Sequence, residues 1–196
     1  MAGILTYIFA SRARTQNEKL QSLAIQDPLT GARNRRAMND DLQLVSVRQK
    51  RHQLPQALMV MDLDHFKQIN DRYGHPAGDQ VLVDFVSLIK RSTRMTDMLY
   101  RFGGEEFLLL LPDTDLHGLH QAAQHLQRRV REQLIGPGGA VTVSIGGAVL
   151  QPGEHWNTWL QRADACLYKA KNSGRNCIIL DCEPARPASV GADPQA

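Results

Sequence analysis

The sequence is poor in the features that would assign it to a special structural class. It has three cysteines among 196 residues, an odd number without the spacing of a metal site, which favours free thiols over a disulfide framework. No stretch reaches the ~20 apolar residues that span a bilayer, and the short apolar run at 3–10 does not predict a secretory signal peptide. The net charge of +3 is too small for a general nucleic-acid binder, so no nucleic-acid partner is expected.

The composition suits a folded domain, and its charge is uneven. Hydrophobic residues make up 42% of the chain, enough for a real core. Residues 1–52 hold nine Lys or Arg and four Asp or Glu, whereas residues 53–196 hold 14 and 16. The basic surplus therefore lies in the first quarter of the chain.

Three segments are expected along the chain. Residues 1–26 predict a connecting or dimerising helix. Its apolar start runs into Arg12 and Arg14, as at the cytoplasmic exit of a membrane helix, and an ordinary N-terminal helix is the alternative. Residues 27–181 carry the patterns of one folded domain, and residues 182–196, with three prolines, predict a disordered tail.

Apolar runs and helical periodicity alternate through the central segment, which predicts the α/β (α+β) class with a mixed central β-sheet flanked by helices. Helices are expected at 34–49, 66–73, 77–93, 116–134 and 156–171. Strands are expected at 57–63, 98–102, 106–111, 140–150 and 176–180. The second and third of these strands would form a β-hairpin around Gly103 and Gly104.

Two carboxylates close the apolar run 57–63. Asp62 and Asp64 would be costly at the end of a buried strand unless they are used, because a buried carboxylate needs a partner. Mg²⁺ favours such carboxylates together with carbonyls, water and phosphates. Turn or cap residues are the alternative reading.

The string RFGGEEF at 101–107 is the most specific signal. Gly103 and Gly104 allow a tight turn and the close approach of a bulky ligand. Glu105 and Glu106 would point to opposite faces of a strand and so have different tasks. The alternative is a solvated hairpin tip.

In this context the chain resembles a GGDEF domain, the catalytic domain of bacterial diguanylate cyclases, in its GGEEF form. The resemblance implies a palm-like nucleotide cyclase fold, and the synthesis of cyclic di-GMP and two pyrophosphates from two GTP with two Mg²⁺ or Mn²⁺ ions per GTP. It rests on the ordered motifs DPLTGARNRR at 27–36, MDLDHFKQIND at 61–71, YGHPAGD at 73–79, RFGGEEF at 101–107, VTVSIGGA at 141–148 and ADACLYKAKNSGRN at 163–176.

The resemblance assigns roles to the acidic residues. Asp62, Glu105 and the carbonyl of Leu63 match metal ligands, and the ions would lower the pKa of the attacking 3′-hydroxyl. Glu106 matches a residue that the family also requires. Metal binding and proton transfer remain open for it.

Further residues match the substrate-binding positions of the family. They are His65, Phe66 and Lys67 at a helix N-terminus for phosphate, Lys171 and Arg175 for phosphate, Gly103 and Gly104 at the signature turn, and Asn70 with Asp79 for guanine. Lys171 and Arg175 would share one face if the last helix persists. The alternatives are a basic helix end for this pair and a helix cap for Asn70.

Arg94 and Asp97 lie where the resemblance implies a product-inhibition site, and a surface ion pair is the alternative. The family often adds an arginine from a facing helix. Here the helix 116–134 offers Arg128, Arg129 and Arg131, whereas His125 holds the usual place.

The expected function is therefore a cytoplasmic diguanylate cyclase, with the inner face of the membrane as a further location. Mutual attack by two GTP molecules requires a homodimer, cyclic di-GMP is the expected inhibitor, and a regulatory protein or sensor domain is an expected partner. A non-catalytic cyclic di-GMP or GTP receptor is the alternative. A polymerase or adenylyl-type cyclase is a third reading, which the Asn70 and Asp79 pair disfavours.

Overall fold

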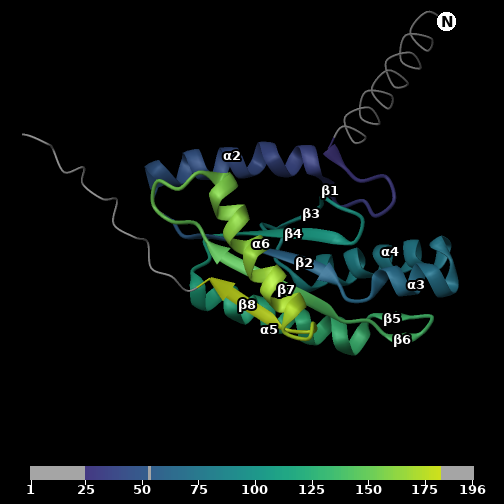
Figure 1. The fold of residues 1–196 in the computed structure, drawn as a ribbon. Coiled ribbons are helices and arrows are strands. Elements are labelled where there is room, and N and C mark those ends of the chain that lie inside the picture. Colours follow the sequence, from purple (N-terminus) through teal and green to yellow (C-terminus); the bar gives the residue numbers. More distant parts are fainter. Residues whose placement is uncertain (1–24, 53, 182–196) are drawn as a thin grey trace, which may run out of the picture.

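The computed structural model describes residues 25–52 and 54–181. At its centre lies a six-stranded sheet with the order β1-β3-β4-β2-β7-β8 (Figure 1). The outer pairs are parallel and the inner pairs are antiparallel, which confirms the predicted mixed sheet. The strands are Arg33–Asn34 (β1), Gln56–Leu63 (β2), Met98–Arg101 (β3), Glu106–Pro112 (β4), Val143–Val149 (β7) and Ile178–Asp181 (β8).

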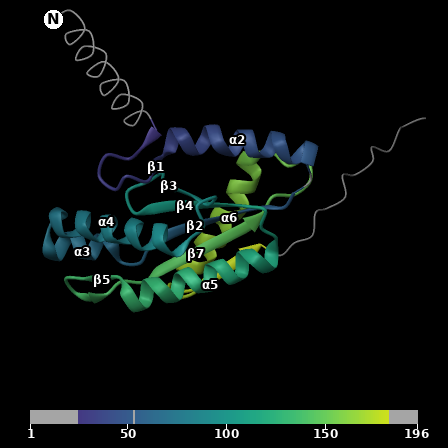
Figure 2. The same ribbon diagram turned by 180° about the vertical axis from the view of Figure 1, so that it is seen from behind.

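Helices cover both faces of the sheet (Figures 1 and 2). Alternation along β2 builds the two layers, because successive side chains point to opposite faces. Met59 and Met61 join a core with α3, α4 and α5, whereas Leu58 and Val60 join a core with α2 and α6. The helices are Arg35–His52 (α2), Phe66–Tyr73 (α3), His75–Ser92 (α4), Leu116–Gln133 (α5) and Trp156–Asn172 (α6).

Every helix and strand predicted between residues 34 and 180 is present, with ends that shift by a few residues. Two pairings were not predicted: β1 with β3, and a hairpin of β5 (Ile135–Gly136) with β6 (Gly139–Ala140). Strands of two residues carry no periodicity of their own, so only their partners define them. The helix predicted for 1–26 and the tail predicted for 182–196 lie outside the described residues, except for Ile25 and Gln26.

Close packing of α6 on β7 places the end of α6 over the sheet. A Cβ atom at Gly146 would lie 2.1 Å from the Leu167 nitrogen and 2.3 Å from the Ala163 oxygen. Only glycine leaves room for a helix backbone at this distance. The buried Trp159 also donates from Nε1 to the Ala148 oxygen at 3.0 Å. These contacts fix where the last turn of α6, with Lys171, lies.

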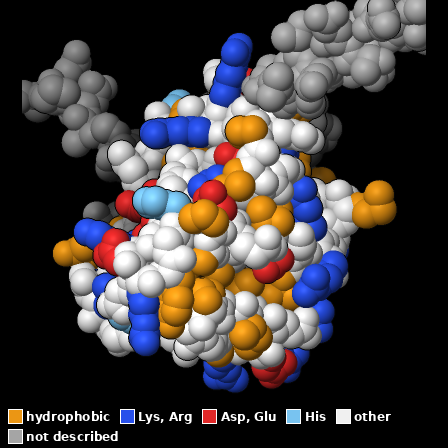
Figure 3. All heavy atoms as spheres, turned by 90° about the vertical axis from the view of Figure 1, so that its right-hand side faces the viewer, with side chains coloured by type: hydrophobic (Ala, Val, Ile, Leu, Met, Phe, Trp, Pro, Cys, Tyr) orange, Lys and Arg blue, Asp and Glu red, His pale blue; other side chains and the backbone are white. Residues whose placement is uncertain are grey.

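The surface over α3, α4 and the β5–β6 hairpin is mixed in character. Figure 3 shows hydrophobic side chains there between Lys and Arg side chains and fewer acidic ones. Tyr73 and Ile135, from these elements, are exposed hydrophobic residues. Among the helices of the described ranges, none combines the length and hydropathy needed to cross a membrane.

Candidate active site and a second groove

Three predicted catalytic carboxylates gather where β2 and β4 meet. Asp62 on β2 lies directly opposite Glu106 on β4 in the antiparallel register, and Glu105 immediately precedes β4. The Leu63 N–H donates to the Glu105 carbonyl oxygen. A Cβ atom at Gly103 would lie 2.2 Å from Glu106 Oε2, so glycine makes room for that side chain. The structure therefore brings Asp62, Leu63 and the signature hairpin together.

Burial and like charge act together on Asp62, whose side chain is 8% exposed. Burial, with a smaller contribution from the charges of Glu105 and Glu106, raises the pKa of Asp62 to about 6 against the opposing hydrogen bond and charge of Lys171. A carboxylate among other carboxylates is stabilised by a cation. The site therefore has the electrostatics of a cation-binding centre.

Lys171 contacts one of the predicted metal ligands. Its Nζ lies 2.6 Å from Asp62 Oδ2, so the residue predicted to bind phosphate is bonded to a predicted metal ligand. The two residues are 109 positions apart in sequence. In the part of the chain that the structure describes, no three His, Cys, Asp or Glu side chains are grouped as a metal site.

Asp64, the second acid of the MDLD string, has a structural role. It is 4% exposed and accepts hydrogen bonds from Thr142 Oγ1 at 2.6 Å, Ser144 Oγ at 2.7 Å and the Asn176 N–H at 3.0 Å. These donors come from the segment that starts β7 and from the loop before β8. The sequence analysis did not identify Thr142 and Ser144 as partners of Asp64. Their alternation in VTVS, which places both hydroxyls on one face of a strand, was the feature that could have indicated it.

Arg175 does not share a helix face with Lys171, which corrects the prediction that required the helix to persist. Helix α6 ends at Asn172, and Gly174 follows with φ of 106°. Arg175 itself is left-handed, with φ of 63°, and is exposed in the loop. The Ser173-Gly174 pair stops the helix, because glycine adopts this backbone region without a Cβ penalty.

The other predicted phosphate residues and the predicted guanine residues lie on or next to the α3–α4 pair. Helix α3 begins at Phe66, His65 adopts φ of 58° at its N-cap, and no His65 side-chain hydrogen bond caps the helix. Asn70 lies against α4, where a Cβ atom at Gly78 would be 1.9 Å from Asn70 Oδ1. Asp79 follows Gly78 and is exposed. Asn70 and Asp79 are thus on facing segments.

Arg101 is a residue of the site that sequence reasoning did not single out. Its Nε and Nη2 donate to the Gly104 carbonyl oxygen at 3.1 and 2.8 Å, which fixes the signature turn. Its Nη1 lies 3.0 Å from Asp27 Oδ1. Asp27 also accepts from the Thr30 N–H at 2.9 Å and from Thr30 Oγ1 at 2.6 Å. The position of Arg101, two residues before Gly103, was the feature of the sequence that could have indicated its contact with the signature turn.

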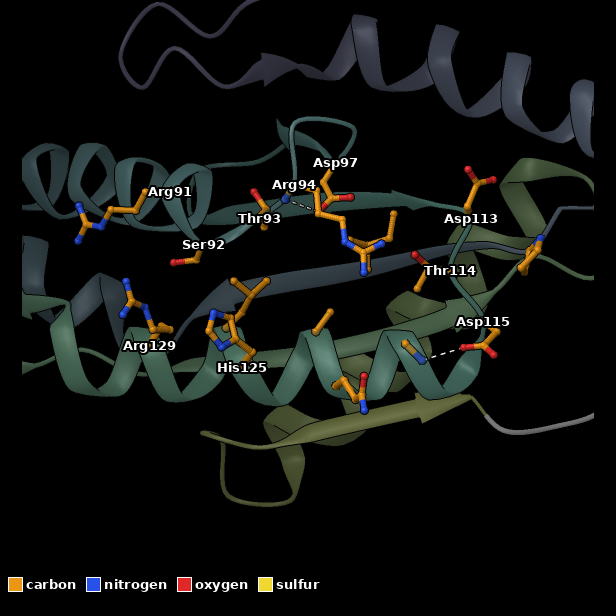
Figure 4. A pocket seen from close by; sticks show the side chains of 16 residues that line it. Arg91, Ser92, Thr93, Arg94, Asp97, Asp113, Thr114, Asp115, His125 and Arg129 are labelled. Atoms are coloured by element: carbon orange, nitrogen blue, oxygen red, sulfur yellow. Dashed lines mark hydrogen bonds between the residues drawn. The ribbon is translucent and has the colours of Figure 1, made fainter.

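A separate groove of about 840 Å³ contains the predicted inhibitory pair. Arg94 and Asp97 line one side of it, and His125 and Arg129 of α5 line the other (Figure 4). Arg91 and Arg129 lie at the same end of the groove (Figure 4). Arg129 therefore shares the groove with Arg94.

Two buried polar atoms of this groove lack a hydrogen-bond partner in the described structure: Asp97 Oδ1 and Arg129 Nε. Asp97 Oδ2 accepts from the Arg94 N–H at 2.8 Å. Burial raises the pKa of Asp97, and the hydrogen bond and charge of Arg94 oppose this. One unsatisfied acceptor and one unsatisfied donor suit a ligand that carries both kinds of group.

The fold and these sites define a class: an α/β domain whose central strands carry an acidic cluster beside a basic helix end. The chain matches the model of the family described as "Diguanylate cyclase, GGDEF domain" over residues 24–177. It belongs to that family.

Individual relatives agree with this assignment. The chain is 37% identical over 187 residues to "Probable diguanylate cyclase DgcT" of Escherichia coli, covering 92% of this chain and 40% of the relative. It is thus less than half as long as DgcT.

Solved structures agree as well. The coiled coil and GGDEF domain of DgcB from Caulobacter crescentus, in complex with c-di-GMP, is 31% identical with a TM-score of 0.83, covering 90% of this chain and 95% of that one. Diguanylate cyclase SiaD from Pseudomonas aeruginosa, in complex with its activator SiaC, is 36% identical with a TM-score of 0.78, covering 92% and 70%.

Proposed function

We propose that this protein is a diguanylate cyclase that condenses two GTP into cyclic di-GMP and two pyrophosphates. The observation that carries the proposal is the cluster of Asp62, Glu105 and Glu106, with Lys171 at 2.6 Å from Asp62. Clustered carboxylates are the oxygen donors that the metal ions of metal-dependent phosphoryl chemistry use. Family membership and the names of the relatives support the same activity.

The residues present fit a hard divalent ion. Asp62, Glu105 and the Leu63 carbonyl would hold Mg²⁺ or Mn²⁺, two ions per GTP, because oxygen ligands and like charges favour such an ion. The chemistry supplied by the ions is neutralisation of phosphate charge and a lower pKa for the 3′-hydroxyl. Glu106 lies opposite Asp62 and would take part in metal binding or in proton transfer.

The remaining residues would bind and orient GTP. Lys67, Arg175 and the backbone of His65 and Phe66 would hold the triphosphate at the start of α3, where helix amides are free. Gly103 and Gly104 would let the nucleotide approach the hairpin.

Guanine would be read by Asn70 and Asp79. A carboxylate accepts from the N1–H and the 2-amino group of guanine, and adenine offers neither donor. GTP would therefore be preferred to ATP, because an unpaired polar group is costly.

The reaction requires two copies of the chain. Each 3′-hydroxyl attacks the α-phosphate of the other nucleotide, so two domains must face one another as a homodimer. In this proposal residues 27–181 form the catalytic domain, and residues 1–26 form a dimerising helix through which a sensor domain or regulatory protein could control the enzyme. GTP as substrate implies the cytoplasm, with the inner membrane face as a further location.

Product inhibition is the proposed role of the second groove. Arg94 would offer its guanidinium to a guanine edge or phosphate, and Asp97 would accept from guanine. Arg129 would supply the second arginine, because it faces the same groove with an unsatisfied donor.

A non-catalytic cyclic di-GMP receptor is the second candidate, and the same unsatisfied atoms favour it. Purified protein incubated with GTP and Mg²⁺ decides between the two. Cyclic di-GMP and pyrophosphate in a 1:2 ratio, detected by chromatography and mass spectrometry, support the cyclase, and a parallel incubation with ATP should give no cyclic product. Binding of cyclic di-GMP without turnover at high protein concentration would support the receptor.

A further inference from the structure

The ion pair between Lys171 and Asp62 connects two residues to which the proposed reaction gives different ligands. Lys171 is a proposed phosphate ligand, and Asp62 is a proposed metal ligand. Their charged atoms are 2.6 Å apart, with the Asp62 side chain 8% exposed and the Lys171 side chain 30% exposed. One ammonium thus occupies the carboxylate oxygen that a metal ion would need.

The local charge favours a cation in this place. Glu105 and Glu106 both act electrostatically on Asp62, so their negative charges add to that of the carboxylate that Lys171 contacts. A divalent ion brings more charge to the same oxygen. Two cations on one carboxylate oxygen repel each other strongly where solvent is scarce, so a bound metal ion and Lys171 in its present position exclude each other.

Lys171 can leave Asp62 without a rearrangement of the fold. Its ammonium ends a flexible four-carbon stem. Helix α6 is held over β7 by the close approach at Gly146, so only the side chain needs to move. The phosphate oxygens of a nucleoside triphosphate beside α3 would provide new acceptors for the displaced ammonium.

We infer that Lys171 is a displaceable substitute for the metal ion: it neutralises Asp62 before metal and nucleotide bind, and its ammonium moves to the nucleotide phosphates when they do. This inference rests on the proposed function. Displacement of Lys171 from Asp62 costs free energy when the metal ion binds alone. The nucleotide offsets that cost, so each ligand strengthens the binding of the other by the same factor.

The test measures Mn²⁺ binding directly, by electron paramagnetic resonance of free Mn²⁺, in the metal-free 196-residue protein. Without nucleotide, Lys171→Met should bind Mn²⁺ at least about fivefold more tightly than the wild type, the lower end of typical coupling factors. Lys169→Met is the matched control, because Lys169 is exposed in the same last turn of α6. Its Mn²⁺ affinity should equal that of the wild type.

A second arm adds the α,β-methylene analogue of GTP, which cannot release pyrophosphate. After correction for Mn²⁺ bound to free analogue, the gain in Mn²⁺ affinity that the analogue produces should be smaller in Lys171→Met than in the wild type. Lys171→Gln should behave in the same way and serves if the Met variant does not fold.

The outcomes separate this inference from the proposed function. Equal or weaker Mn²⁺ affinity of both Lys171 variants without nucleotide would overturn the inference and leave the cyclase proposal intact. A wild-type protein that binds no Mn²⁺ with or without the analogue would overturn both.

Discussion

Arg101 and Asp27 form an ion pair, with 3.0 Å between Nη1 and Oδ1, that ties the turn before α2 to the signature hairpin. Both side chains are mostly buried, 15% and 19% exposed. The same arginine donates twice to the Gly104 carbonyl. The pair therefore couples the turn at Asp27, which precedes α2, to the active-site turn.

Removal of the Asp27 carboxylate should therefore loosen the turn and the hairpin together. Asp27→Ala loses the bonds to Thr30 and leaves the Arg101 guanidinium without its carboxylate, which should lower the free energy of unfolding by about 1–3 kcal/mol. Turnover should fall with it. Denaturant titration and product assays measure both effects.

Asp40→Asn, at an exposed position of α2, should leave both quantities unchanged. Stability of Asp27→Ala equal to the wild type would show that the ion pair does not hold the turn.

Glu105 is expected to be indispensable for turnover. Glu105→Ala removes a proposed metal ligand, and the rate of cyclic di-GMP formation should fall by more than about 100-fold, beyond the usual effect of losing an outer-shell partner. Glu132→Ala, an exposed acid of α5, is the control. Near-wild-type turnover of Glu105→Ala would refute the metal role.

A substitution at Gly78 tests the proposed guanine-binding role of Asn70 without changing Asn70 itself. A methyl group at position 78 would lie 1.9 Å from Asn70 Oδ1, so Gly78→Ala must displace that side chain. Loss of one hydrogen bond to guanine should raise the KM for GTP by roughly tenfold. Helix propensity favours alanine by about 1 kcal/mol, so the helix itself is not weakened.

Steady-state kinetics against GTP measure this effect, with Gln80→Ala on the exposed side of α4 as control. An unchanged KM in Gly78→Ala would mean that Asn70 does not contact the nucleotide.

The groove predicts which arginines control product inhibition. Arg94→Ala and Arg129→Ala should each raise the half-inhibitory concentration of cyclic di-GMP by about tenfold or more, because hydrogen bonds to charged groups contribute about 1.5–3 kcal/mol. Each variant is compared with its own uninhibited rate. Arg128→Ala is the matched control, being exposed beside Arg129 on α5. If Arg129→Ala kept the half-inhibitory concentration of the wild type, the second arginine of the inhibitory site would be another residue.

Tyr100 predicts a loss of stability at alkaline pH. Its buried hydroxyl donates to Asp41 Oδ2 at 2.7 Å. Burial raises the pKa of Tyr100, the Asp41 carboxylate adds to this, and the nearby Arg33 opposes it. Above about pH 10 the unfolded chain releases the phenolic proton while the folded chain retains it, so stability falls as pH rises, by about 1.4 kcal/mol per pH unit for this group.

The comparison of Tyr100→Phe with the wild type isolates this contribution. In denaturant titrations between pH 8 and pH 11, the variant should start about 1 kcal/mol lower and then show the shallower decline. Tyr168→Phe, at an exposed tyrosine, should follow the wild type. Parallel curves for Tyr100→Phe and the wild type would refute the prediction.

Much of the fold follows from local patterns. The helix at 66–73 has the predicted bounds, and the apolar run at 57–63 forms all but the first residue of β2. Both are decided by periodicity, glycine and burial within a few residues. The β5–β6 hairpin was missed because two residues cannot show a period, and β1 exists only through its parallel pairing with β3.

The residues of the acidic group could be predicted from the sequence, whereas the contacts of the basic residues with them could not. Motifs identify Asp62, Glu105 and Glu106 as one acidic group, and the register of β2 with β4 brings them together. The contact of Lys171 with Asp62 was not predicted, because nothing local relates a helix end to a strand 109 residues away. The helix face that Lys171 and Arg175 would share if the last helix persisted does not form, because α6 ends at Asn172.

Short-range patterns and motif spacing are enough to predict the order of elements, the family and the residue types of the acidic centre. The charges that meet depend on tertiary packing: Lys171 with Asp62, Arg101 with Asp27, and Arg129 with the groove of Arg94 and Asp97. An ion pair forms only where two side chains come close in space, whatever their separation in sequence. Packing of α6 on β7 sets the first of these distances, the position of β3 beside the turn before α2 sets the second, and the position of α5 across the groove sets the third.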